Sequence, residues 1–243
     1  MITLHEGAIL IADVHFAPYR RAFLDFVSAL EKGDIQTTQL ILMGDIFDVL
    51  VAQLTRSVEQ HREPIARLNR LAQSIEILYF EGNHDFRLAT LFPSIRVLPL
   101  QAQPLIVNAK GYKIALAHGD WSEPLGYQLF TRILRSWIVV KALNFYDKHT
   151  QNRFVRNLEA KLSSKNLCKK NQNLIAKKSK QLASVLKEAE YLFEGHYHQG
   201  IALKMGKLNY HNLDAFACNK SYFVVQFLPN GVVLNRHLFK EKN

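Results

Sequence analysis

Five short segments of this 243-residue chain carry side chains that could bind metal ions. In chain order the segments are Asp13-Val14-His15, Gly44-Asp45, Gly82-Asn83-His84-Asp85, His118-Gly119-Asp120 and Gly195-His196-Tyr197-His198. Between them they offer Asp13, His15, Asp45, Asn83, His118, His196 and His198 as candidate ligands, with His84 beside the asparagine. These groups are enough for two divalent ions that share one carboxylate. Two ions about 3.5–4 Å apart are a recurrent apparatus for cleaving phosphate esters and anhydrides.

Taken one at a time, the segments are weak signals, because Gly-Asp is common in turns and single histidines are often packed or exposed. Asp13 and His15 are two residues apart, so on an extended strand end both side chains would lie on one side and could chelate one ion. We expect the same of His196 and His198. Asp45 follows a buried run, where a carboxylate needs a compensating charge or hydrogen bonds, so it is our candidate for the ligand that bridges two ions.

The segment Gly82-Asn83-His84-Asp85 is more specific than the others, although an ordinary Asx-type turn is the alternative. The amide oxygen of Asn83 could be a metal ligand. His84 could stand beside the metals as an acid or a phosphate contact. Asp85 could fix the tautomer of the imidazole.

The position of the five segments along the chain supports the metal site. Each segment directly follows an apolar run rich in Ile, Leu and Val, at residues 8–12, 39–43, 75–80, 113–117 and 191–193. Runs of this kind are typical of strands buried on both faces. Open α/β sheets place their sites at the carboxyl ends of such strands. We therefore expect the candidate ligands to converge.

The remaining pattern predicts how the chain is divided. Helices are expected at residues 21–32 and 58–71, and an antiparallel hairpin at 222–228 and 232–239. Between Leu129 and Phe145, apolar residues recur at helical spacing, and residues 153–187 hold ten Lys or Arg and a single acid, Glu159. We predict a core formed by residues 1–120 and 189–243, with a helical insertion at 121–188 mounted over the site.

Composition bounds the class of protein. The net charge of +10 predicts an anionic partner, whether nucleic acid, nucleotide or acidic lipid. Cys168 and Cys218 are far apart and form no CxxC pair, so we expect free thiols in a reducing cytosol and neither a disulfide framework nor a zinc ribbon. The chain starts with a predicted strand instead of a signal peptide, and it holds no run of about 20 apolar residues, so no membrane span is expected.

Together, the five segments resemble the ordered motifs of the calcineurin-like metallophosphoesterases, over about residues 9–198. The chain is similar, more narrowly, to the UDP-2,3-diacylglucosamine diphosphatases of lipid A biosynthesis. That likeness rests on Ile11-Ala12-Asp13-Val14-His15-Phe16, Gly44-Asp45-Ile46-Phe47-Asp48, Gly126-Tyr127-Gln128 and Ser163-Ser164-Lys165. One departure is His84, since the best-known members of that group have arginine there.

The resemblance implies a layered α/β/β/α sandwich with a helical lid. It implies one ion held by Asp13, His15 and His198, a second held by Asn83, His118 and His196, and Asp45 shared between them. The reaction would be hydrolysis of the pyrophosphate of a UDP-sugar lipid, with His84 and Asp85 as catalytic residues and Asn83, Ser164 and Lys165 contacting substrate. The ions would be Mn²⁺, with Fe²⁺ or Zn²⁺ as alternatives. The location would be cytoplasmic, on the anionic inner face of the inner membrane, with no nucleic acid partner.

Three alternatives stay open at this point. The apolar residues between 129 and 145 could shelter acyl chains while the basic run docks on lipid, or the former could pack on the core while the latter is a solvated face. The same metal site would serve a nuclease or phosphodiesterase, although no aromatic stacking platform is interleaved with the basic run. A binding scaffold without chemistry is disfavoured because all seven ligand positions are filled.

Overall fold

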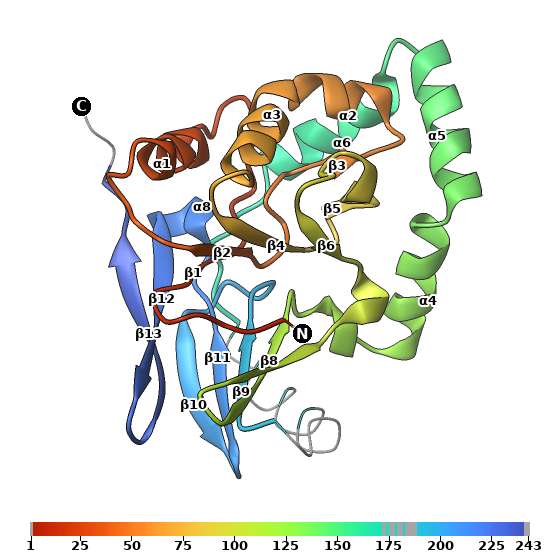
Figure 1. The fold of residues 1–243 in the computed structure, drawn as a ribbon. Helices are drawn as coiled ribbons and strands as arrows, with labels where there is room; N and C mark the ends of the chain where they lie inside the picture. Colours follow the sequence, from red (N-terminus) through yellow and green to blue (C-terminus); the bar gives the residue numbers. More distant parts are fainter. Residues whose placement is uncertain (1, 172–173, 175–177, 179–181, 183–188, 241–243) are drawn as a thin grey trace.

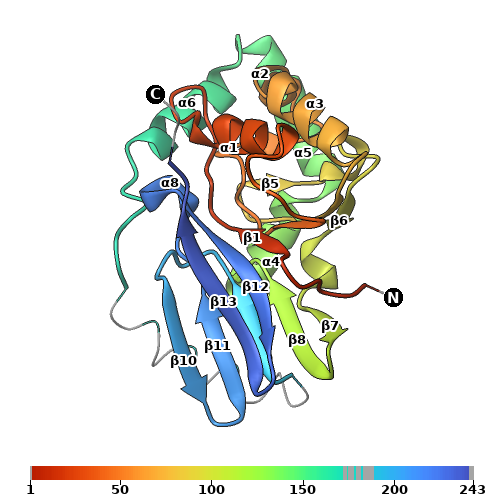
Figure 2. The same ribbon diagram turned by 60° about the vertical axis from the view of Figure 1, so that its left-hand side comes forward.

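The computed structural model describes residues 2–171, 174, 178, 182 and 189–240. Two sheets packed face to face form its centre, with helices over the outer face of the larger sheet (Figures 1 and 2). Within the described residues, every helix is too short or too polar to cross a bilayer.

The larger sheet has six strands, and its centre is parallel. Its strands in spatial order are β13 (Gly231–Leu238), β12 (Ser221–Leu228), β1 (Ile9–Ile11), β2 (Gln39–Leu42), β4 (Glu76–Phe80) and β6 (Arg96–Leu98). The pairs from β1 to β6 are parallel, whereas β12 and β13 form the predicted hairpin and pair antiparallel to β1. Side chains of β1 alternate between two cores, with Ile9 and Ile11 facing the helices and Leu10 facing the second sheet. Burial on both faces explains the unbroken apolar runs in the sequence.

The second sheet supplies the remaining two predicted strands. Its five strands are β10 (Ile201–Met205), β11 (Leu208–Asn212), β9 (Tyr191–Glu194), β8 (Tyr112–Ala117) and β7 (Leu105–Ala109). Strand β9 lies parallel to both β8 and β11. A short ribbon of β3 (Leu50–Val51) and β5 (Asp85–Phe86) lies outside both sheets. All five predicted strands are thereby confirmed to within two residues at each end.

Helices α1 (Ala22–Glu31), α2 (Thr55–Gln60) and α3 (Arg62–Leu71) lie over the six-stranded sheet (Figure 1). The predicted helix over 58–71, with Pro64 expected near a first turn or a kink, is divided at His61 into two helices. Pro64 is the cause: its ring would clash with the carbonyl of Gln60 in a continuous helix, but it is tolerated in the first turn of α3. The short elements α8 (Phe216–Asn219), η1 (Leu88–Thr90), η2 (Leu100–Ala102) and η3 (Asp120–Ser122) connect the strands.

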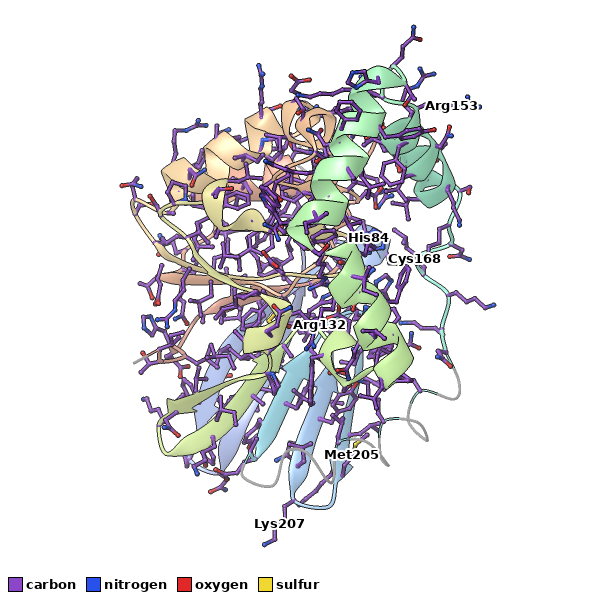
Figure 3. The ribbon with its side chains drawn as sticks, turned by 90° about the vertical axis from the view of Figure 1, so that its right-hand side faces the viewer. His84, Arg132, Arg153, Cys168, Met205 and Lys207 are labelled. Carbon is purple, nitrogen blue, oxygen red and sulfur yellow. A yellow bond between two sulfur atoms is a disulfide. The ribbon has the colours of Figure 1, made fainter. Side chains whose placement is uncertain are left out.

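Three described helices fall within the predicted insertion: α4 (Leu125–Leu134), α5 (Trp137–His149) and α6 (Arg153–Ser163). The Ser136 hydroxyl caps α5 by accepting from the Val139 N–H at 3.3 Å, which separates it from α4. Val140 and Val155 pack on Val51 and Phe86, so α5 and α6 are attached to the β3–β5 ribbon. Figure 3 shows α4 and α5 facing the viewer, with His84 visible beside them. The domain limits at 120 and 189 stay a prediction.

Candidate dinuclear metal site

The structure brings all seven predicted ligands together at the carboxyl ends of β1, β2, β4, β8 and β9. Asp13, His15 and His198 form one cluster whose ligand-capable atoms all lie within 4.8 Å of one another. A second cluster with the same limit consists of Asp45, His118 and His196. The Asn83 amide oxygen lies 3.4 Å from Nε2 of His118, beside the second cluster. Two triads plus an amide oxygen are the donor set that the sequence analysis anticipated.

The backbone that places these side chains has a conformation that was not predicted from the sequence. Asp13, His15, Asp45, His196 and His198 all have positive φ, between 47° and 67°. The expectation that Asp-x-His and His-x-His are extended is therefore wrong. Non-glycine residues rarely adopt this left-handed region, and each such residue costs roughly 1–3 kcal/mol, so surrounding contacts must impose it. Strain concentrated at five neighbouring positions is typical of a functional site.

Neighbouring loops impose that backbone. The N–H of His15 donates to the Asp45 carbonyl at 2.9 Å, and the N–H of Ala217 donates to the Asp13 carbonyl at 3.2 Å. The N–H of His196 donates to both carboxylate oxygens of Asp13, at 3.0 and 2.9 Å. Gly44 is required beside them, since it has φ +88° and a Cβ there would collide with the ring of His118. The loops after β1, β2 and β9 thus hold one another.

His15, His118 and His198 are each held through one ring nitrogen, which leaves the other ring nitrogen for a ligand. The Nδ1 atoms of His118 and His198 lie 2.9 and 2.6 Å from the carbonyls of Met43 and Leu167, so each Nδ1 carries a proton. Their Nε2 atoms lie 3.6 and 3.2 Å from the carboxylates of Asp45 and Asp13 and are the atoms available to a metal ion. Nδ1 of His15 lies 3.1 Å from the Asp48 carboxylate. The buried Nε2 of His15 has no hydrogen-bond partner among the described residues. An orphaned imidazole nitrogen facing other donors fits a metal ion, and such outer partners are how proteins orient metal-binding histidines.

Electrostatics within the second cluster agree with a cation site. Burial raises the pKa of Asp45, but His118 and His84 outweigh burial and hold it well below its usual range. Burial lowers the pKa of His118, yet the Asp45 carboxylate overcomes it and raises the value well above normal. Burial, with the charge of His118, lowers the pKa of His196 well below its usual value. A carboxylate held ionised at 3.6 Å from an imidazole prefers positive charge beside it.

Asp85 has a different role from the predicted one. Its carboxylate does not orient His84; it accepts from the N–H groups of Asp45 at 3.0 Å, Ile46 at 2.6 Å and Gly82 at 2.9 Å, and from the Tyr79 hydroxyl at 2.6 Å. Burial and the charge of Asp45 raise the pKa of Asp85 to about 7. The interpretation of Asp85 as the group that fixes the imidazole tautomer is therefore wrong. It shapes the loop that carries Asp45.

His84 faces the site as expected. The carbonyl of Asp48 accepts from its Nδ1 at 2.8 Å, so Nε2 is directed elsewhere and lies 4.0 Å from Oδ2 of Asp45. The His84 and His15 ring centroids are 4.9 Å apart. With Asp45 and His15, His84 forms a third group that could hold an ion. Its position beside both clusters suits a proton donor or a phosphate contact.

Two charged residues near the site were not selected from the sequence. Asp48 holds the ring of His15 and also accepts from Arg20 at 2.6 Å. Its place in Gly44-Asp45-Ile46-Phe47-Asp48, three residues after a candidate ligand, could have indicated a role at the site. Arg135, at the end of α4, pairs with Asp120 at 3.0 Å and donates to the Gly82 carbonyl at 2.9 Å. Nothing in the local sequence pattern distinguished Arg135 from its exposed neighbour Arg132.

The two cysteines contradict a prediction. Cys168 and Cys218 form a disulfide with their Cα atoms 5.7 Å apart, so the expectation of free thiols is wrong. They are separated by 50 residues, and only the fold brings them together. Cys168 belongs to residues 165–171, here called the strap, whose Leu167 carbonyl holds the His198 ring. The disulfide therefore ties the strap to α8 beside the metal clusters.

Of the two predicted substrate contacts in the insertion, Lys165 is close to the site and Ser164 is not shown to reach it. The Ser164 hydroxyl donates to the Lys161 carbonyl at 2.9 Å, at the exposed end of α6. Lys165 lines a cavity of about 650 Å³, here called the apolar cavity, which also reaches Asn83 and His84. Its apolar lining comprises Val49, Val51, Leu54, Phe86, Phe130, Leu134, Val140, Leu143, Phe154, Leu158 and Leu162.

Part of the basic run lies outside the described residues, including Lys177, Lys180 and Lys187. Within the described part, Lys178 is fully buried and pairs with Glu194 at 3.0 Å. The run is thus not uniformly a solvated face.

Known proteins share this fold and this sequence pattern. A dimetal phosphatase from Danio rerio superposes with a TM-score of 0.54, at 15% identity and 95% coverage of both chains. No family model matches the chain. The fold and the paired clusters resemble those of the calcineurin-like metallophosphoesterases, which are metal-dependent hydrolases of phosphate esters and anhydrides.

Curated relatives show a closer similarity to one kind of enzyme. The chain is similar to the UDP-2,3-diacylglucosamine hydrolase of Pseudomonas fluorescens, with 27% identity over 200 residues that cover 79% of this chain and 78% of the relative. It is 33% identical to the enzyme of the same name from Ralstonia nicotianae, over 136 residues covering 53% of this chain. That second match spans half the length of the relative.

Proposed function

We propose that this chain hydrolyses the pyrophosphate of UDP-2,3-diacylglucosamine, releasing UMP and 2,3-diacylglucosamine 1-phosphate. One observation carries the proposal: the apolar cavity shares Asn83 and His84 with the candidate metal site. A substrate that fits both must join an apolar body to a phosphate group. The names of the curated relatives point to the same kind of molecule.

Different residues of the site would have different roles in such a reaction. Two divalent ions, Mn²⁺ in our proposal, would supply an acidified water and positive charge to offset the transition state. Asp45 would serve both ions, with Asp13, His15 and His198 on one and Asn83, His118 and His196 on the other. His84, through the nitrogen that Asp48 leaves unbound, would donate to a phosphate or leaving-group oxygen. Lys165 would contact the substrate from the rim that it shares with Asn83.

The apolar cavity has a physical purpose in this proposal. Each methylene moved from lipid into water costs about 0.8 kcal/mol, so exposing ten of them would cost roughly 8 kcal/mol. The aliphatic and aromatic walls supplied by α4, α5 and α6 remove that cost. Residues 121–188 would thus act as the lid over the site.

The outer face of the same helices suits a membrane surface. Eight of the thirteen large exposed hydrophobic side chains among the described residues lie on α4 and α5, among them Leu125, Leu129, Ile138 and Phe145. The Lys141 ammonium lies 3.9 Å from the Trp137 ring centroid, a pairing of interfacial types. This exposure argues against the alternative that the apolar stripe packs on the core. We infer peripheral association with the cytoplasmic face of the inner membrane, where each nearby Lys or Arg adds about 1 kcal/mol of attraction.

The direct test is release of UMP from UDP-2,3-diacylglucosamine in the presence of Mn²⁺. Wild type should release UMP, and Asp45→Ala should abolish release because the shared carboxylate is gone. Asp25→Ala is the matched control, since Asp25 is an exposed acid on α1. Intact lipid together with turnover of single-stranded DNA or bis(p-nitrophenyl) phosphate would favour a nuclease or phosphodiesterase instead.

A further inference from the structure

A second cavity borders the metal clusters from a different set of residues. It measures about 700 Å³ and is lined by residues 165–167 and 169–171 of the strap and by residues 196–199 of the loop after β9. This polar cavity includes His196 and His198, whereas the apolar cavity includes Asn83 and His84. Among the described residues that line them, Lys165 alone is common to both. The metal clusters therefore lie between an apolar compartment and a polar one.

The chemistry of the polar cavity selects an anion that also carries hydrogen-bonding groups. Its described lining contains Lys165, Lys169 and Lys170 and no acidic side chain. The Lys170 ammonium is committed to the strap, donating to the carbonyls of His198 at 2.9 Å and Gln199 at 2.7 Å. Lys165 and Lys169 are exposed, and within the described part of the chain their ammonium groups have no hydrogen bond or ion pair. Two such lysines beside a metal centre attract phosphate oxygens.

Amide side chains give the same cavity a means of recognising a base. Asn166, Asn171 and Gln199 all line it. The Gln199 amide accepts from the Asn171 N–H at 2.7 Å and donates to the Tyr197 carbonyl, so it shapes the wall, and the exposed amide of Asn166 is the candidate contact for a base. An amide offers both a donor and an acceptor, which complement the alternating carbonyl and N–H groups of a pyrimidine edge. The apolar cavity is walled mainly by aliphatic and aromatic groups, and its one amide, Asn83, is a candidate metal ligand.

We propose that the polar cavity is the subsite for the nucleoside monophosphate half of the substrate, with Lys165 and Lys169 on its phosphate. This assignment rests on the proposed function and extends it, because it gives each half of a nucleotide-linked lipid a separate compartment. The scissile anhydride would then lie over the clusters, with the lipid sugar beside His84 and the nucleotide beside His198. The strap, anchored by the disulfide, forms one wall of the subsite.

The test is product inhibition of the Mn²⁺-loaded full chain by UMP and, separately, by 2,3-diacylglucosamine 1-phosphate. Lys169→Gln should weaken inhibition by UMP roughly threefold to tenfold, in keeping with loss of one partly exposed charge contact. Inhibition by the lipid product should stay unchanged in that variant. Lys204→Gln, which removes an exposed charge from β10, is the matched control and should leave both unchanged.

Direct UMP binding by calorimetry, with ribose 5-phosphate for comparison, separates this subsite from the proposed function. Wild type that binds UMP more tightly than ribose 5-phosphate, with Lys169→Gln binding UMP more weakly, supports the subsite even if the lipid is not cleaved. Equal UMP binding in wild type, Lys165→Gln and Lys169→Gln overturns the subsite even if wild type releases UMP from the lipid. Wild type that does not bind UMP overturns it as well.

Discussion

Arg135 connects the predicted lid to the loops that carry the candidate metal ligands. The loss of stability expected on its removal can be worked out from its contacts. Its guanidinium lies 3.0 Å from Asp120 Oδ2 and 2.9 Å from the Gly82 carbonyl, and it lies over the Phe86 ring with its carbon 5.3 Å from the centroid. Asp120 is fully buried and Arg135 is 7% exposed. One residue of α4 thus contacts two of the five motif segments.

The expected cost of Arg135→Met follows from this burial. Breaking a buried pair by removing one partner typically costs about 3–5 kcal/mol, because the other charge is left uncompensated. Burial already raises the pKa of Asp120, against the opposing pull of His118 and Arg135. Loss of Arg135 raises that pKa further, so Asp120 can take up a proton and limit the cost. We therefore expect the lower end of the range, about 3 kcal/mol, or roughly 6–12 °C in Tm for a chain of this size.

Thermal unfolding of the metal-free protein measures this difference. The matched control is Arg132→Met, because Arg132 is exposed on the same helix (Figure 3) and should shift Tm by no more than about 1–2 °C. Asp120→Asn combined with Arg135→Met should recover part of the loss, since no charge is left unpaired. A Tm for Arg135→Met equal to that of Arg132→Met, or a double variant whose two losses simply add, would refute the role given to this pair.

Three further outcomes are expected. Burial lowers the pKa of His61, so as pH falls below 6.5 the unfolded chain binds a proton before the folded chain does, and stability is lost. In His61→Gln, the free energy of unfolding measured with denaturant should fall less steeply with pH, by up to about 1.4 kcal/mol per pH unit. An unchanged pH dependence would count against this. Cys168→Ser frees the strap from Cys218, so the free energy of unfolding should fall by roughly 2–4 kcal/mol. EDTA should also remove metal from the site beside His198 faster in this variant than in wild type. Equal rates of metal removal would contradict this. Ile138→Glu should weaken sedimentation with anionic vesicles while leaving turnover of a detergent-dispersed substrate intact, and equal sedimentation would show that α5 does not touch the bilayer.

The ends of the buried strands could be predicted from the sequence, and so could the meeting of the ligands. Apolar runs on both sheets are continuous because both faces are covered, which makes their ends visible in the sequence. Asp13, Asp45 and His118 follow those ends directly, and the carboxyl ends of parallel strands meet at one edge. The strand ends were therefore sufficient to predict that these candidate ligands converge, but not to predict the roles of Asp48, Asp85 and Arg135.

Features set by contacts distant in sequence could not be predicted. The left-handed backbone of Asp13 and His196 depends on hydrogen bonds between loops that are far apart in the chain. The role of Asp85 depends on which N–H groups surround its carboxylate, and adjacency to His84 was misleading. The disulfide could not be predicted from a motif, because Cys168 and Cys218 lack a characteristic spacing.

The central claim is that seven side chains hold two cations, and metal content tests it most directly. Protein saturated with Mn²⁺, freed of excess by gel filtration and analysed by mass spectrometry of the elements should retain about two ions per chain. Asp45→Ala, which removes the shared carboxylate, should retain one ion or none, whereas the Asp25→Ala control should retain two. Wild type that retains no Mn²⁺, Fe²⁺ or Zn²⁺ above the level of a protein lacking such clusters would contradict the account.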